Sequence, residues 1–325
     1  NYKVEYPDLT DYNLLNAAEK LELERRAGLY DEYYTGESSA GRLASYANKL
    51  YNVKRGVNTY WLSQPLQTVF AHRHGINLEG GNESLRYKLY AGINEAPGVM
   101  KQTGLSGKSV SLDIRYRYKG LLISNIAYVD YNVSDRTSPY GSFKEYASLN
   151  PYYTIRDEKG NIPLYLEEPL DMYDFSSGKY VTNPMYTLYN TKDRNTAFEV
   201  RDAFRAEYSP ISNLRLAMDL TVTKTQSDTD IFKSANHTQF QTGELLPLED
   251  RGSYLWSNAT SLQYDLAFTA SFNQIWKNKH LLSTFFRYNV TETKNHTAGV
   301  NVTGFPNDNM DEVFLGAKMK ETTGD

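Results

Sequence analysis

The sequence has no cysteine, no long hydrophobic run and no excess of positive charge. A large secreted eukaryotic β protein usually carries disulfides, so the lack of cysteine suits a cytosolic protein or one of the bacterial envelope. A mean hydropathy of −0.61, without apolar runs of about 20 residues, excludes helices that span a membrane. At a formal net charge of −4 there is no basic stripe, and we therefore expect no nucleic-acid partner.

What the sequence does contain is a period-two alternation of apolar and polar residues, in segments about ten to thirteen residues long. In 110–118 the even positions are apolar and the odd positions are polar or charged. Lys119-Gly120 then predicts a tight turn, and the alternation resumes in 121–133. Three more pairs of such segments flank short turns, at 80–83, 209–213 and 276–279. The chain thus predicts four β-hairpins that follow one another in a meander.

The links between the predicted hairpins are long, whereas the turns within them are short. The links hold about 15 residues in Asn94–Lys108, about 60 in Ser134–Asn195 and about 30 in Gln226–Ser253. Structureless loops of this length are uncommon in compact soluble domains. Outer-membrane barrels have short periplasmic turns and long extracellular loops, so the alternation favours a barrel that spans a membrane.

The two faces of the predicted strands also differ in charge. The polar face of 198–208 carries four charged residues, Glu199, Arg201, Arg205 and Glu207. A Lys or Arg on the lipid face of a barrel costs roughly 2–4 kcal/mol at the midplane, so we expect the opposite, apolar face to contact outer-membrane lipid. Asp202 and Asn125 are exceptions, because both fall on the apolar face, where they require a partner or a bulge.

These features predict an all-β fold, an antiparallel up-and-down transmembrane β-barrel of which all 325 residues form part. We expect long extracellular loops at 7–67 and 134–196. Asn1–Tyr6 has the pattern of the end of a strand and 322–325 that of a loop, so we interpret the chain as a fragment of a larger barrel.

The first of these loops is predicted to contain a helix. Asn16 is a suitable N-cap, Glu19 follows three residues later as in a capping box, and Gly28 stands after the helix end. The helical period places four residues on one face, Leu14, Ala18, Leu21 and Arg25. We expect this helix to pack the loop rather than to bind a ligand.

Several motifs, taken in their order and spacing, resemble the SusC/RagA family of TonB-linked outer-membrane proteins. The longest is DLTDYNLLNAAEKLE at 8–22. The others are RGVNTYWL at 55–62, PGVM at 97–100, SPYGSF at 138–143, NPYY at 150–153 and NPMY at 183–186. Their order and spacing extend over most of the chain, from residue 8 to residue 186.

The resemblance implies a barrel of about 22 strands in the bacterial cell outer membrane, of which this chain would supply about nine. It also implies an N-terminal plug through which TonB energises transport, and a SusD-like surface lipoprotein that forms a lid. Members of the family import glycan oligomers or, in some cases, peptides. The plug and the C-terminal strands would lie outside this chain.

Five aromatic residues in the predicted loops are candidates for substrate binding, Trp61, Tyr140, Phe143, Tyr152 and Tyr153. Their rings could stack on sugars or contact the lipoprotein lid, because aromatic faces suit the apolar CH patches of sugars. Packing within the loop is the alternative, and we favour it.

Seven charged residues on the predicted polar face are candidates for guiding a polar solute or for contacting the plug, Asp113, Arg115, Arg117, Asp130, Glu199, Arg201 and Arg205. Their alternative role is mutual pairing along a wet wall, which requires no ligand. We favour pairing or plug contact over a role in solute binding.

No residues predict catalysis or a cofactor. The sequence lacks a G-x-S-x-G elbow, an H-E-x-x-H motif, a P-loop and a G-x-G-x-x-G motif. We therefore do not expect this protein to be an enzyme. His72 and His74 share one strand face and have the chemistry of metal ligands, but we favour a packing role and predict no metal site.

The leading hypothesis is therefore TonB-dependent import of nutrient oligomers, with glycans ahead of peptides as the cargo. One alternative is a soluble or surface-attached all-β carbohydrate-binding module, in which the apolar faces would pack against each other. A passive porin, without a plug, is the other.

Overall fold

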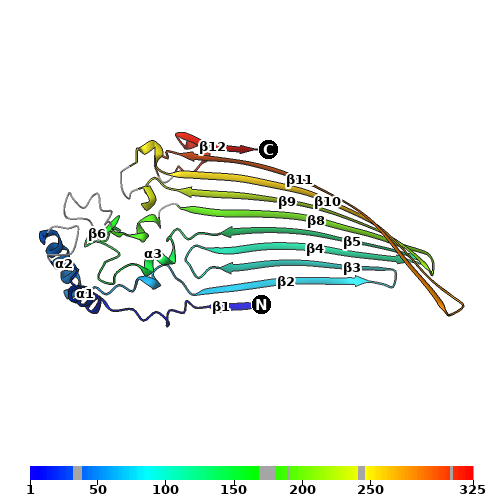
Figure 1. Cartoon of the computed structure of the whole chain (residues 1–325), viewed down its shortest axis with the longest axis horizontal. Helices are drawn as coiled ribbons and strands as arrows, with labels where there is room; N and C mark the ends of the chain where they lie inside the picture. The colour runs from blue at the N-terminus through cyan, green and yellow to red at the C-terminus, as the bar shows by residue number, and fades with distance from the viewer. Residues whose placement is uncertain (32–38, 168–180, 189–190, 241–245, 308–309, 325) are drawn as a thin grey trace.

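The computed structural model describes residues 1–31, 39–167, 181–188, 191–240, 246–307 and 310–324. They form one ten-stranded antiparallel sheet, a separate two-stranded sheet and several short helices. The order in the large sheet is β1-β2-β3-β4-β5-β8-β9-β10-β11-β12, so each strand pairs with the next strand of that sheet along the chain (Figure 1). The topology is up-and-down, without a crossover in the described sheet.

The strands of the large sheet are β1 (Tyr2–Glu5), β2 (Val69–Gly81), β3 (Leu85–Pro97), β4 (Gly104–Tyr118), β5 (Leu121–Asp135), β8 (Lys192–Ile211), β9 (Leu214–Lys233), β10 (Ser253–Trp276), β11 (His280–Thr303) and β12 (Lys318–Gly324). The small sheet pairs β6 (Tyr165–Glu167) with β7 (Val181–Thr182). The helices are α1 (Ala17–Arg26), α2 (Ser39–Lys54), η1 (Trp61–Ser63), α3 (Phe143–Ala147), η3 (Pro184–Leu188), η4 (Thr238–Phe240), η5 (Leu248–Asp250) and η6 (Val313–Leu315). Among the described residues, none of these helices is both long and apolar enough to cross a membrane.

The four hairpins expected from the sequence are confirmed as β2–β3, β4–β5, β8–β9 and β10–β11. The number of strands differs from the expectation, since the large sheet has ten strands rather than about nine. The additional strand is β12, which includes residues 322–324 that were expected to lie in a loop. Its polar sequence gives no alternation, and it is ordered instead by backbone pairing with Ala298–Thr303 of β11.

The strands are longer than their apolar alternation, so the links between hairpins are shorter than expected. β9 has 20 residues, and β10 and β11 have 24 each. Only 98–103, 136–191 and 234–252 remain between the hairpins. The segment 225–230 is polar on both faces and still belongs to β9, because backbone pairing continues where the apolar alternation is interrupted. Apolar patterning therefore predicts the apolar band of a strand rather than its full length.

The hairpins are staggered along the sheet. Arg115 of β4 is level with the last residue pair of the β2–β3 hairpin, and β4 continues for three more residues toward its own turn. β8–β9 extends two residues beyond that, and β10–β11 four more. Nine residues over six strands, at about 3.3 Å per residue and about 4.8 Å between strands, place the line of turns about 45° from the perpendicular to the strands. If all turns lie at the same depth in the membrane, the strands tilt by about 45° from the membrane normal. This tilt is close to the 35–45° of membrane barrels.

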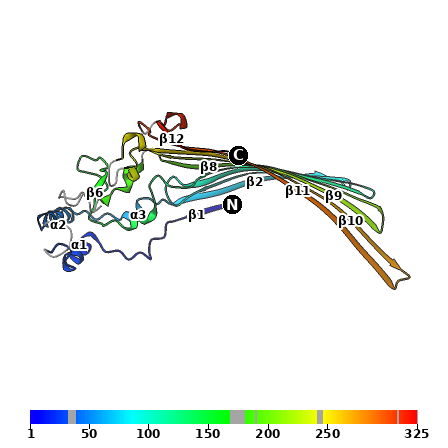
Figure 2. The ribbon, with the colours of Figure 1, turned by 45° about the horizontal axis from the view of Figure 1, so that its top comes forward.

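All short turns lie at one end of the sheet and all longer connections at the other, where α1, α2, α3 and β6 are found (Figure 1). The sheet itself is a single curved layer (Figure 2). In the described part of the chain, no second layer of strands covers its apolar face. The apolar side chains are accordingly exposed, for example Ile76 at 75% and Phe286 at 63%. The packed sandwich that a soluble module needs is not formed by these residues.

The apolar face is continuous across the sheet. One row of directly paired residues runs from β2 to β5 as Leu78, Leu89, Leu112 and Ala127. Another crosses β8 to β11 as Phe204, Leu220, Leu266 and Val290. Charged residues share this face mainly toward the loop end of the strands, as Glu95, Lys108, Arg194, Lys224, Glu292 and Lys294. The face thus divides into an apolar band and a charged border.

The two polar exceptions on the apolar face are partners of each other. Asn125 on β5 donates from Nδ2 to Oδ1 of Asp202 on β8, at 2.7 Å. Since Asn125 is directly opposite Phe204 and Asp202 is opposite Ala127, the two polar side chains are diagonal neighbours. The hydrogen bond explains how both residues are tolerated beside apolar neighbours, because it satisfies part of their hydrogen-bonding capacity away from water.

The first loop contains the expected helix. Asn16 caps α1 and forms the capping box with Glu19, and Gly28 follows with a φ of +76°. The expected face is right at Leu21 and wrong at the other positions, because Leu14, Ala18 and Arg25 are exposed. The helix buries Ala17 and Glu24 beside Leu21. Glu24 is buried because it accepts hydrogen bonds from Tyr30, close in the chain, and from Tyr152 of a distant segment. The second helix, α2, was not expected, although Tyr46, Leu50 and Val53 recur at helical spacing and pack on the loop core.

We expect Asn125→Leu to destabilise the barrel by about 1–3 kcal/mol, because it leaves the Asp202 carboxylate without its partner in an apolar setting. The double variant Asn125→Leu/Asp202→Leu should recover most of that loss. A double-mutant cycle from urea unfolding in lipid vesicles measures both values. Additive effects of the two single substitutions would contradict a direct interaction.

Candidate functional site

The polar face of the sheet gathers the charged residues singled out in the sequence. Asp113, Arg115 and Arg117 lie on β4, Asp130 on β5, and Glu199, Arg201 and Arg205 on β8. The register places them on one face, since Ser124 of β5 is opposite both Arg115 and Arg205. Tyr128 is opposite Arg201, and Asp130 is opposite Glu199. The sequence therefore predicts correctly that these charges share a face.

Pairing accounts for part of this set. Arg115 contacts Asp113 at 2.9 Å, and Arg205 contacts Asp219 at 2.8 Å and Glu207 at 3.2 Å. Glu207 also holds Arg215, at 2.6 Å. Asp130 forms no ion pair among the described residues but accepts a hydrogen bond from the side-chain amide of Asn132. Within the same residues, Arg117, Arg201 and Glu199 form no ion pair either. These three are the charges of the set that are free to meet a solute or another part of a larger protein.

Beyond β8 the polar face changes character. On β9 it presents small hydroxyl side chains in succession, Thr221, Thr223, Thr225, Ser227 and Thr229. On β11 it continues with Asn289, Thr291, Thr293, Asn295 and Thr297. Hydroxyl and amide groups both donate and accept hydrogen bonds. This sector offers many equivalent, uncharged hydrogen-bonding positions along the strands.

The loop aromatics fall into two groups. Trp61, Tyr152 and Tyr153 belong to a buried core, with exposures of 2%, 1% and 5%. The Trp61 indole donates to the carbonyl of Asn150 at 2.9 Å. Tyr140 and Phe143 are half-buried, and Tyr140 lies beneath the Lys101 ammonium. Burial of the first three favours packing within the loop, and leaves Tyr140 and Phe143 as the members of the set within reach of a ligand.

The loop core is built around a buried carboxylate. Glu24 of α1 accepts hydrogen bonds from the Tyr152 hydroxyl, at 3.0 Å to each oxygen, and from the Tyr30 hydroxyl at 2.7 Å. The Lys20 ammonium lies 3.3 Å away. Burying a charge is costly unless it is paired and hydrogen-bonded, and Glu24 is both. This carboxylate therefore ties α1 to a segment that lies 128 residues further along the chain.

A second carboxylate joins α2 to the same core. Glu167 forms an ion pair of 2.8 Å with Lys49, and accepts hydrogen bonds from Ser45, at 2.5 Å, and from Tyr153. The Lys49 ammonium also stands over the rings of Tyr30 and Tyr152. Burial on its own raises the pKa of Glu167, but Lys49 and the two hydroxyls outweigh it and hold the pKa below the usual 4.5. The loop layer is thus held by charge pairs as well as by apolar packing.

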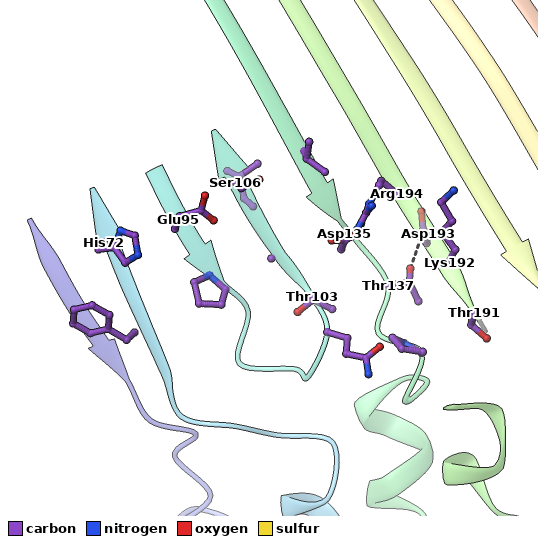
Figure 3. Close-up of a pocket in the computed structure, with 17 residues that line it drawn as sticks. His72, Glu95, Thr103, Ser106, Asp135, Thr137, Thr191, Lys192, Asp193 and Arg194 are labelled. Atoms are coloured by element: carbon purple, nitrogen blue, oxygen red, sulfur yellow. Dashed lines mark hydrogen bonds and ion pairs between the residues drawn. The ribbon is translucent and has the colours of Figure 1, made fainter. Parts of the chain in front are cut away.

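A pocket of about 560 Å³ lies at the loop-side ends of β2 to β8. Its polar lining includes His72, Glu95, Ser106, Asp135, Lys192 and Arg194 (Figure 3). Asp135 forms a two-pronged pair with Arg194, at 2.8 and 3.1 Å. Asp193 is held by Arg136 and Thr137. Sequence reasoning did not identify this pocket, because its residues come from five strands and only the register brings them together.

His72 and His74 share a strand face as expected, with ring centroids 5.2 Å apart. The ring of Tyr2 packs edge-on against His74 at 5.5 Å, which is a contact of the packing kind that the sequence favoured. His72 differs from its neighbour, since its Nδ1 is buried and has no hydrogen-bond partner among the described residues.

No protein-family model matches the chain. No curated protein matches it either. Among solved structures, the RagAB peptide transporter matches with a TM-score of 0.76 and 13% identity, over 100% of this chain and 38% of that chain. The RagAB peptide importer in its 'closed-closed' state matches with a TM-score of 0.73, 15% identity and the same coverage. Its 'open-open' state gives a TM-score of 0.71 and 15% identity, over 100% of this chain and 37% of that chain.

The likeness shows the fold. The whole chain follows the RagAB chain over slightly more than a third of that chain's length. The all-β barrel architecture predicted from the sequence is therefore confirmed, both by the register of the sheet and by this match.

We expect Tyr152→Phe to loosen the loop layer by about 1–3 kcal/mol, since it removes a donor from the buried Glu24 carboxylate. Hydrogen exchange should speed up in α1 and in 150–153, while β9 to β11 remain protected. Tyr60→Phe is the matched control, because Tyr60 is 41% exposed and should change nothing. Unchanged exchange in α1 of the Tyr152→Phe variant would show that the carboxylate cluster does not hold the layer.

The depressed pKa of Glu167 predicts a pH dependence of the loop layer. The pair with Lys49 stabilises the layer above pH 4.5, where the carboxylate is charged in the folded and unfolded states, and is lost as the pH falls through the lower, folded pKa. Limited proteolysis of α2 should therefore accelerate only below pH 4.5. Glu167→Gln should raise the rate at neutral pH and remove this step. If proteolysis of the wild-type protein accelerates already at or above about pH 6, where histidine titrates, Glu167 is ruled out as the cause.

Proposed function

We propose that this chain forms part of the wall of a TonB-dependent importer in the bacterial cell outer membrane, and that the importer takes up nutrient oligomers. The supporting observation is the division of one staggered sheet into an exposed apolar face and a charged, hydroxyl-rich face. Lipid accepts the first, and a water-filled or plugged lumen needs the second. The likeness in fold to RagAB extends over the whole chain and supports the same assignment.

We propose peptides as the cargo ahead of glycans. The sequence resemblance implied glycans first, but the structures that match are named as a peptide transporter and a peptide importer. The polar face is also compatible with a peptide. Its neutral hydroxyl and amide rows suit a peptide backbone, and Arg117, Arg201 and Glu199 suit charged termini or side chains. Glycans are the second candidate, on the basis of the SusC/RagA motifs and the half-exposed rings of Tyr140 and Phe143.

The proposed mechanism places different tasks on two parts of the molecule. The loop layer, together with a SusD-like lipoprotein lid, receives the cargo at the cell surface. A plug that precedes this chain in the full-length protein is pulled by TonB and opens the lumen. Arg117, Arg201 and Glu199 then face either the plug or the passing cargo. The wall itself performs no chemistry, and we propose neither a catalytic residue nor a cofactor.

Deletion of the gene for the full-length protein tests the proposal. We expect the deletion strain to lose growth on peptide mixtures as the sole amino-acid source and to keep growth on free amino acids. Complementation should need an intact TonB-binding segment, which separates active import from a passive porin. Loss of growth on defined glycans instead would reverse the order of the two cargoes. Normal growth on both, with normal uptake of labelled oligomers, would contradict an importer.

A further inference from the structure

The pocket at the strand ends lies on the same face as the apolar band. Its residues are directly paired across the sheet, His72 with Glu95, Glu95 with Ser106, and Ser106 with Val133. Each lies two positions along its strand from a residue of the last row of the band, which contains His74, Ile93, Lys108, Tyr131 and Phe198. The pocket therefore begins at the loop-side border of the apolar band. Figure 3 shows its labelled side chains at the strand ends, next to the loops.

The lining has the composition of a site for a polar, charged head. Asp135 and Asp193 are neutralised by Arg194 and Arg136. Lys192 is less engaged, since its Nζ lies 4.0 Å from Asp230. Glu95 forms no ion pair among the described residues, and the buried Nδ1 of His72 has no hydrogen-bond partner there. Lys192 can thus meet an anion, with the Asp135-paired Arg194 beside it, while Glu95 can meet a cation that accompanies the anion.

The size and the hydroxyl content of the pocket limit the ligand further. A volume of about 560 Å³ is much larger than a single phosphate group and lies within the range of ligand pockets. Hydroxyl groups of Thr103, Ser106 and Thr137 line it beside the charged residues. A sugar bearing phosphate groups offers matching hydroxyls and negative charge. Apolar chains attached to such a sugar would continue onto Ile93, Tyr131 and Phe198, with Lys108 between the first two.

We propose that this pocket binds the phosphorylated sugar head of a glycolipid in the outer leaflet, with its acyl chains on the apolar band below. The inference rests on the proposed function in one respect, namely that the loop side of the sheet faces the outside of the cell. Lys192 and Arg194 contact phosphate, the threonine and serine hydroxyls contact the sugar, and Glu95 contacts a bridging divalent cation. The bound lipid forms part of the outer wall at the level of the membrane surface.

The test uses the full-length protein, purified in detergent and stripped of lipid. Binding of lipid A, of dephosphorylated lipid A and of phosphatidylglycerol is measured by native mass spectrometry. Lys192→Gln should weaken lipid A binding about fivefold, since a basic residue near an anionic lipid surface contributes about that factor. Lys294→Gln is the matched control, because Lys294 lies on the same face of β11 but outside the pocket, and it should bind like the wild type.

Equal binding by the Lys192→Gln and wild-type proteins overturns the proposal. So does equal binding of dephosphorylated lipid A, or tight binding of phosphatidylglycerol with the same dependence on Lys192. A requirement for divalent cations that Glu95→Gln removes would support the role of Glu95. The lipid assay and the growth assay fail independently. A protein that binds lipid A but imports nothing refutes the proposed cargo alone, whereas import without lipid binding refutes the pocket alone.

Discussion

In the hydrocarbon interior of a membrane no water is present to hydrogen-bond a free backbone amide or carbonyl, so each strand there needs a neighbour on both sides. The described sheet meets this condition from β3 to β10 without interruption. Register shifts in the large sheet occur between Tyr208 and Ile211, beside a short turn, and between Asn301 and Val302, at the loop end. The ladder is regular through the apolar band, which is where irregularity would be most costly.

A regular ladder fixes the direction of every side chain, and this separation of faces connects the fold to its proposed use. One face carries leucine, isoleucine, valine and phenylalanine, and the opposite face carries the charged and hydroxyl-bearing residues. Asn125 and Asp202 are polar residues on the apolar face, and they are tolerated there because they hydrogen-bond to each other. Outside the band the rule relaxes, and charged residues reach both faces. The strand-end pocket lies in that border.

The sequence predicted those parts of the fold that depend on local pattern. Alternation gave the hairpins and both faces, and the cap at Asn16 gave α1. Features that depend on pairing were not predicted. The segment 225–230 of β9 and the strand β12 have no apolar period, because backbone hydrogen bonds hold them. The contacts of Glu24 with Tyr152 and of Glu167 with Lys49 join distant segments, so no local window reveals them. For the same reason, the sequence could name Trp61, Tyr152 and Tyr153 as loop aromatics but could not place them in a core.

The most direct test of the account is a cysteine scan of β10 in outer-membrane vesicles, which is free of background in this chain because its sequence contains no cysteine. Single cysteines at each position from 262 to 273 are spin-labelled and exposed to a lipid-soluble and a water-soluble relaxation agent. We expect the lipid-soluble agent to act on the even positions, such as Leu266 and Phe268, and the water-soluble agent on the odd positions, such as Gln263 and Thr269. Equal access at neighbouring positions, or access of the water-soluble agent to both faces, would contradict a wall between lipid and water.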